Sequence, residues 1–131
     1  MDLDGYDMPS WVNKTILIVE DNIDNKEYIE ELLFDTGVEI LSANTGAEAL
    51  EIFQNNQSIN LVLMDIQLPD TNGHVLTRTM KKVNPKLVII AQTAYASSDD
   101  KDDCLNAGCN DFIAKPIHPK IFFNTILKYL K

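Results

Sequence analysis

The sequence predicts a doubly wound α/β fold, in which a five-stranded parallel sheet is covered by helices on both faces. Short apolar runs rich in β-branched residues alternate along the chain with segments of helical periodicity. Runs of this kind are typical of parallel strands that are buried on both faces. Five strand–helix units follow one another, which is the pattern of a doubly wound sheet.

The chain of 131 residues has a typical length for one domain. Residues 1–13 combine acids with Pro9 and Ser10 and show no hydrophobic periodicity, so we expect a flexible N-terminal leader. Trp11 is an exception that we expect to pack on the sheet edge. The domain itself is predicted to span residues 14–131.

The first unit comprises a strand at residues 16–19 and a helix at about residues 25–35. Gly37 ends this helix, because glycine readily adopts the left-handed conformation that closes helices. The predicted apolar face consists of Ile29, Leu32 and Leu33.

The second unit comprises a strand at residues 39–43 and a helix that begins at Thr45. Glu48 follows three residues later, and this S/T-x-x-E spacing is a signature of a capped helix N-terminus. The inner face of the helix is predicted to contain Ala49, Leu50 and Phe53.

The third unit begins with a strand at residues 61–64, which leads directly into Asp65. The loop at residues 68–73 contains Pro69 and Gly73, which are both turn-forming residues. A helix at about residues 74–83 follows and ends before Asn84-Pro85.

In the fourth unit, a strand at residues 87–91 continues through Gln92 to Thr93. Ser97 and Ser98 are both suitable caps for the next helix, and Gly108 closes it.

The fifth unit has a strand at residues 112–114 that leads into Lys115, and Pro119 suits the first turn of the last helix. The predicted buried face of that helix consists of Ile121, Phe122, Ile126, Leu127 and Leu130.

Polar groups therefore follow four of the strands, namely Glu20-Asp21, Asp65, Thr93 and Lys115. With the strand order 2-1-3-4-5 of flavodoxin-like sheets, these groups meet at the rim where ligands bind. Clustered carboxylates suit a hard divalent cation, while a lysine and a hydroxyl suit phosphoryl oxygens. The sequence thus predicts phosphoryl transfer onto a carboxylate.

Composition excludes several other functions. A net charge of -9 without a basic run argues against nucleic-acid binding. The apolar runs are far shorter than the roughly 20 residues that cross a bilayer, and the acidic start does not resemble a signal peptide, so we expect a cytoplasmic protein with no membrane contact. Cys104 and Cys109 lack metal-ligand spacing, so we expect buried, reduced thiols and no zinc site.

Four motifs occur in order at matching intervals: Val19-Glu20-Asp21-Asn22, Met64-Asp65-Ile66-Gln67-Leu68-Pro69 with Gly73, Gln92-Thr93-Ala94, and Lys115-Pro116. From about Lys14 onward the chain resembles the receiver domain of two-component response regulators. The residues around the first two motifs are similar to those in receivers of hybrid sensor histidine kinases. A free-standing regulator and a domain of a larger kinase both fit this resemblance.

The resemblance implies that Asp65 accepts a phosphoryl group from the phosphohistidine of a histidine kinase or histidine phosphotransfer domain. It implies that Mg²⁺ is held by Asp21, Asp65 and the backbone carbonyl of Gln67, with Glu20 acting through a water. The family more often has Asp at position 20. Thr93 and Lys115 would each bind a phosphoryl oxygen. Transfer and autodephosphorylation would be self-catalysed, and we identify no kinase catalytic domain in the chain.

The resemblance also implies a cis peptide between Lys115 and Pro116 and a conformational switch. Phe112 occupies the position of an aromatic residue that swings inward as the Thr93 hydroxyl moves, although plain core packing of Phe112 fits equally well. Tyr95 and Gln67 border the site and would affect the lifetime of the acyl phosphate. The apolar rim residues Ile23, Pro116 and Ile117 are candidates for docking a helical partner.

The sequence is compared with two other functions of the same kind of site, an enzyme and a receiver that only binds partners. A haloacid-dehalogenase-like phosphatase needs a second acid two residues after the nucleophile, whereas position 67 is Gln, and there is no G-x-x-x-x-G-K run for a nucleotide. A degenerate receiver that only binds partners would not need Asp21, Asp65, Thr93 and Lys115. The cognate kinase, the stimulus, the output and dimerisation are left open by the sequence.

Overall fold

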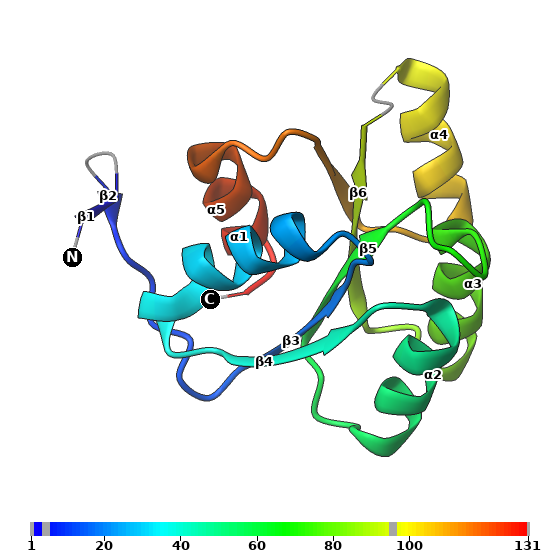
Figure 1. Ribbon diagram of the computed structural model, residues 1–131, viewed down its shortest axis with the longest axis horizontal. Coiled ribbons are helices and arrows are strands. Elements are labelled where there is room, and N and C mark those ends of the chain that lie inside the picture. The colour runs from blue at the N-terminus through cyan, green and yellow to red at the C-terminus, as the bar shows by residue number, and fades with distance from the viewer. Residues whose placement is uncertain (1, 4–5, 95–96, 131) are drawn as a thin grey trace.

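A computed structural model describes residues 2–3, 6–94 and 97–130 of the chain (Figure 1). Five parallel strands form one sheet in the order β4-β3-β5-β6-β7. Their bounds are β3 Thr15–Val19, β4 Glu39–Ala43, β5 Leu61–Asp65, β6 Val88–Thr93 and β7 Asp111–Ala114. Counting these five strands along the chain gives the order 2-1-3-4-5, so the predicted fold class is confirmed.

Helices cover both faces of this sheet (Figure 1). On one face lie α1 (Ile23–Leu33) and α5 (Pro119–Leu127), and on the other lie α2 (Gly46–Asn55), α3 (Gly73–Val83) and α4 (Ser98–Ala107). Alternate strand residues enter two separate apolar clusters, one on each face. The structure therefore has the three layers that the fully apolar strands predict.

The helix ends are set by local caps. Asn22 caps α1 by accepting a hydrogen bond from the Asn25 amide at 2.9 Å, so this helix begins two residues before the predicted start. It ends at Leu33, and a 3-10 turn, η1 (Phe34–Thr36), leads to Gly37 at φ 75°.

The predicted caps of the later helices are present. The Thr45 hydroxyl accepts from the Glu48 amide at 3.1 Å. Of the two candidate serines, Ser97 is the cap of α4, and it forms a reciprocal capping box with Asp100. Gly108 closes α4 with φ 108°, as predicted, and Pro119 stands in the first turn of α5. The cap of α5 is His118, which was not predicted.

The predicted buried face of α5 was partly wrong. Phe122, Ile126 and Leu130 are buried, but Ile121 is 56% exposed and Leu127 is 38% exposed. Phe123 is buried in their place, because a helix turns about 100° per residue and positions 122, 123 and 126 therefore lie within about 100° of one another. Leu130 lies beyond the end of α5 at Leu127.

The N-terminal residues contain a short antiparallel pair, β1 (Asp2–Leu3) with β2 (Tyr6–Asp7). Trp11 is 1% exposed and joins the cluster beneath α1 and α5, against which Ile40 of the edge strand β4 also packs. Its ring centroid lies 6.2 Å from that of Phe123, and its amide donates to the Thr36 carbonyl at 2.7 Å.

Both cysteines are free and buried, as predicted. Among the described helices, none has the length and apolar character needed to cross a membrane.

Candidate phosphoacceptor site

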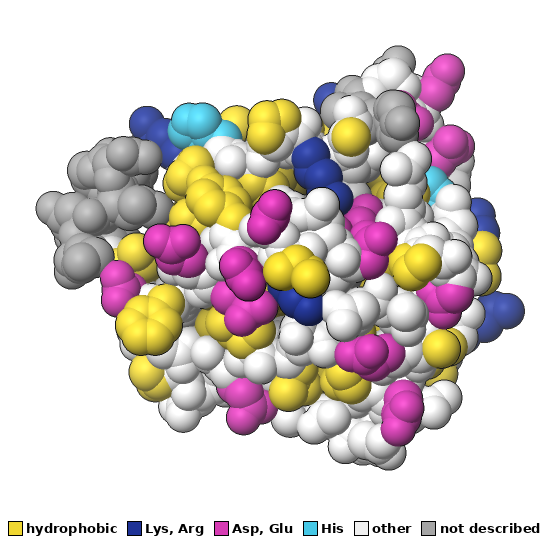
Figure 2. Space-filling model, in the orientation of Figure 1, with side chains coloured by type: hydrophobic (Ala, Val, Ile, Leu, Met, Phe, Trp, Pro, Cys, Tyr) yellow, Lys and Arg dark blue, Asp and Glu magenta, His cyan; other side chains and the backbone are white. Residues whose placement is uncertain are grey.

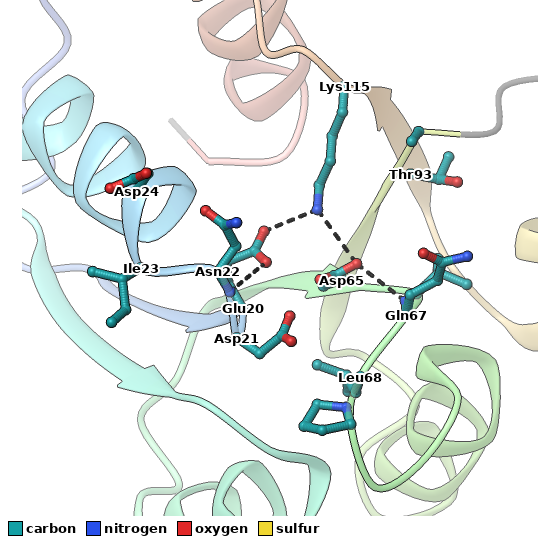
Figure 3. A pocket seen from close by; sticks show the side chains of 13 residues that line it. Glu20, Asp21, Asn22, Ile23, Asp24, Asp65, Gln67, Leu68, Thr93 and Lys115 are labelled. Carbon is teal, nitrogen blue, oxygen red and sulfur yellow. Dashed lines mark hydrogen bonds and ion pairs between the residues drawn. The ribbon is translucent and has the colours of Figure 1, made fainter.

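The predicted polar groups converge at the carboxyl ends of β3, β5, β6 and β7. They line a cavity of about 820 Å³, shown in Figure 3. All of the predicted metal and phosphoryl contacts lie on its wall: Glu20, Asp21, Asp65, Gln67, Thr93 and Lys115. The strand ends therefore assemble one site, as the rim argument predicts.

Lys115 bridges the two buried carboxylates of this cavity. Its Nζ lies 3.0 Å from Oε1 of Glu20 and 3.4 Å from Oδ1 of Asp65. Figure 3 shows the lysine extending from the end of β7 toward both acids. Glu20 is fully buried and Asp65 is 4% exposed, so the ion pairs are shielded from water and the lysine offsets charge that would otherwise be costly.

Glu20 is held by three groups besides its own backbone. Nδ2 of Asn25 donates to Oε1, the Asn22 amide donates to Oε2 at 3.2 Å, and Lys115 pairs with Oε1. Because both oxygens are already engaged, a role through a water suits Glu20 better than direct metal ligation. Asn25 was missed by the sequence reasoning, since its contact depends on the exact start of α1.

The two buried carboxyls affect each other's ionisation. Burial raises the pKa of Asp65 to about 7, with a further contribution from the hydrogen bond and charge of Glu20 that Lys115 and the Gln67 amide only partly oppose. Burial also acts to raise the pKa of Glu20, but hydrogen bonds with Asp65, Asn25 and Lys115 outweigh it and lower that pKa. Of the two coupled carboxyls, Asp65 therefore has the higher pKa.

Three carboxylates are close enough to share a cation. One oxygen from each of Glu20, Asp21 and Asp65 lies within 4.8 Å of the others, and Asp21 is exposed to the cavity. An all-oxygen set with one solvent-exposed carboxylate suits Mg²⁺, which keeps several waters and takes few protein ligands. The residues present thus fit a magnesium ion.

The loop after Asp65 is held at its far end and in its middle. At its far end, Gly73 donates to the Ile66 carbonyl at 2.8 Å, and a Cβ at Gly73 would lie 2.4 Å from the Asp65 carbonyl oxygen, which excludes any side chain. In the middle, Asp70 accepts from the amides of Gly46 at 2.8 Å and Ala47 at 3.0 Å.

These two hydrogen bonds lower the pKa of Asp70 and fasten the loop to the N-terminus of α2. Sequence reasoning missed Asp70 because its partners are 23 and 24 residues away.

Comparison with known proteins identifies this arrangement. The family model for the response regulator receiver domain matches residues 16–127. The chain belongs to this family. It is 35% identical over 121 residues to the polar-differentiation response regulator DivK of Brucella ovis, covering 91% of this chain and 98% of that protein.

Two solved receiver structures are similar. The receiver domain of sensor histidine kinase PA1611 from Pseudomonas aeruginosa, which has a magnesium ion in its active site cleft, is 31% identical with a TM-score of 0.81, over 89% of this chain and 97% of that one. The receiver domain of Ssk1 from Saccharomyces cerevisiae, crystallised with the histidine phosphotransfer protein Ypd1, is 28% identical with a TM-score of 0.83, over 94% and 90%.

The predicted switch residues of the receiver domain lie on adjacent strands. Thr93 is 7% exposed on the cavity wall, and its carbonyl accepts from the Lys115 amide at 2.8 Å. Phe112 is half-buried against the cluster beneath α2, α3 and α4, with Nζ of Lys101 5.0 Å from its ring centroid. The Lys115-Pro116 peptide is cis, as the resemblance implied. Tyr95 lies outside the described residues.

The apolar rim of the receiver differs from the prediction in one residue. Ile23 is 63% exposed and Pro116 is exposed, but Ile117 is 8% exposed and belongs to the core beneath α1 and α5. Ile117 is therefore unavailable for docking. Hydrophobic side chains reach the surface over α1 and α5 among scattered acidic ones (Figure 2).

Proposed function

We propose that Asp65 accepts a phosphoryl group from a phosphohistidine and that the modified domain relays a two-component signal through a change of conformation. The observation that carries this proposal is the buried Asp65 carboxylate 3.4 Å from the Lys115 ammonium, beside two further acids and a threonine. A histidine kinase or a histidine phosphotransfer domain is the proposed donor. The Ssk1 receiver, which was crystallised with such a phosphotransfer protein, supports this choice.

The proposed chemistry assigns a task to each residue. Asp21, Asp65 and the carbonyl of Gln67 would hold Mg²⁺, with Glu20 acting through water, and the ion would neutralise charge on the phosphoryl oxygens. The magnesium in the PA1611 receiver supports this assignment. A carboxylate oxygen of Asp65 attacks phosphorus, the bond from phosphorus to the histidine nitrogen breaks, and Lys115 and Thr93 donate hydrogen bonds to the transferring oxygens.

Positioning rather than acid–base chemistry supplies the catalysis. The Gln67 amide, 3.1 Å from Oδ1 of Asp65, and the Lys115 ammonium fix the nucleophile before a donor arrives. The proposed switch then uses Thr93 and Phe112, which lie on the paired strands β6 and β7. Two free thiols agree with a reducing compartment, and we propose that the domain acts in the cytoplasm.

Acetyl phosphate with Mg²⁺ should add one phosphoryl group to the wild-type chain, and Asp65→Asn should abolish the addition because the carboxylate nucleophile is lost. Intact-protein mass spectrometry at neutral pH measures the adduct. The matched control is Asp102→Asn, which replaces an exposed acid of α4 that does not line the cavity. Modification that persists in Asp65→Asn, or that is equally fast in EDTA, would show that the proposed site is wrong.

Asp21→Ala should weaken Mg²⁺ binding, whereas Lys115→Ala should not. Loss of the exposed Asp21 carboxylate removes a ligand and should weaken Mg²⁺ binding at least tenfold. Loss of Lys115 removes a cation that competes for Glu20 and Asp65, so Mg²⁺ should bind as well as or better than in wild type, while phosphorylation no longer drives the switch. Calorimetric Mg²⁺ titrations measure both affinities, and equally large losses would contradict the division of roles.

A further inference from the structure

Gln92, near the end of β6, is a buried polar side chain without a partner. It is fully buried, and its Oε1 and Nε2 are the only buried side-chain polar atoms without a hydrogen bond within residues 2–3, 6–94 and 97–130. An unpaired buried amide is costly, because it gives up hydrogen bonds to water and gains none. A methionine or leucine would fill the same place without that cost.

The sheet register places Gln92 beside the phosphoacceptor. It lies opposite Asp65 on β5 and opposite Ile113 on β7. Residues paired across parallel strands project to the same face, and Ile113 belongs to the cluster beneath α1 and α5. Gln92 therefore stands next to Asp65, on the face that α1 and α5 cover.

Lys115 crosses the end of β6 to reach its partners. The lysine follows β7, whereas the carboxylates of Glu20 and Asp65 follow β3 and end β5, on the other side of β6 (Figure 3). A phosphoryl group on Asp65 that is also held by Thr93 would lie toward β6. The lysine ammonium would then move away from Glu20 and toward the strand that carries Gln92.

We propose that Gln92 is a positioning residue for Lys115. When Asp65 carries a phosphoryl group, the ammonium donates one hydrogen bond to a phosphoryl oxygen and another to Oε1 of Gln92. A lysine has three N–H donors, so one ammonium serves both acceptors. The amide is unpaired only in the unphosphorylated state, and its cost there favours the phosphorylated state. This inference rests on the function proposed above.

Gln92→Met tests the inference, with beryllofluoride and Mg²⁺ as a phosphoryl analogue. Without ligands, the variant should melt at a higher temperature than wild type, because the unpaired amide is gone. Its affinity for beryllofluoride in calorimetry should be roughly tenfold weaker, because a hydrogen bond to the lysine is lost. The control Gln54→Met, at an exposed position of α2, should change neither value.

A double-mutant cycle separates positioning from packing. In a Lys115→Ala background, Gln92→Met should cause no further loss of beryllofluoride affinity. An equal loss with and without the lysine overturns the inference, and so does wild-type affinity in Gln92→Met. Gln92→Leu is a second apolar replacement. If Gln92→Met and Gln92→Leu both melt at a lower temperature than wild type, the inference is also overturned. Failure of the proposed function is distinct, since wild type itself would then bind no beryllofluoride.

Discussion

Without Mg²⁺, the free energy of unfolding of the wild-type domain should fall by about 3 kcal/mol between pH 5 and pH 8, and Asp65→Asn should remove most of this fall. The Asp65 carboxyl ionises in the unfolded chain near pH 4, but in the folded protein its pKa is about 7. The stabilisation that the Asp65 carboxyl contributes is complete below its pKa in the unfolded chain. It is lost as the pH rises through its pKa in the folded protein. Glu20, whose pKa is lowered, loses its contribution only at lower pH.

Urea unfolding in EDTA at several pH values measures this dependence. Asp65→Asn keeps the shape of the side chain but cannot ionise, so its stability should be nearly constant over the same range and higher than that of wild type at pH 8. Mg²⁺ at ten times its dissociation constant should stabilise wild type by about 1.4 kcal/mol and the variant by less. Equal pH slopes in the two proteins would show that Asp65 ionises normally in the fold.

Trp11→Ala should destabilise the domain by about 3–5 kcal/mol, the usual cost of removing a large buried aromatic side chain. The Trp11 side chain is 1% exposed and packs beside Phe123. Val12→Ala is the matched control, because Val12 is 66% exposed and its loss should change stability little.

Urea unfolding of both variants also tests the predicted domain boundary at residue 14. If residues 1–13 were a leader independent of the domain, Trp11→Ala would be as stable as wild type. A large loss would place the start of the folded unit at or before Trp11.

The sheet and the rim were predictable because their signals are local. An apolar run such as Leu61–Met64 identifies a buried strand by itself, and the residue after it lies at the rim in any parallel sheet. Asp65, Thr93 and Lys115 were found in this way. Their convergence follows from the strand order alone.

The supporting contacts were not predictable, because each depends on three-dimensional detail. Asn25 reaches Glu20 only because α1 starts at Ile23, and Asp70 binds a helix end 24 residues away. In the sequence Gln92 is one more residue of a predicted strand, and only the structure shows that its side-chain amide has no hydrogen-bond partner. The predicted buried face of α5 wrongly included Ile121 and omitted Phe123, because both residues are apolar and composition alone does not distinguish them.

The attachment of Asp70 to the amides of Gly46 and Ala47 has a consequence for metal affinity. Ordering a loop costs conformational entropy. When a loop becomes ordered only on binding its ligand, this entropy loss lowers the affinity for the ligand. Here the loop that carries Gln67 is already ordered by α2, so the entropy is lost during folding. Magnesium affinity should therefore depend on whether the first turn of α2 is intact, although that helix supplies no atom to the ion.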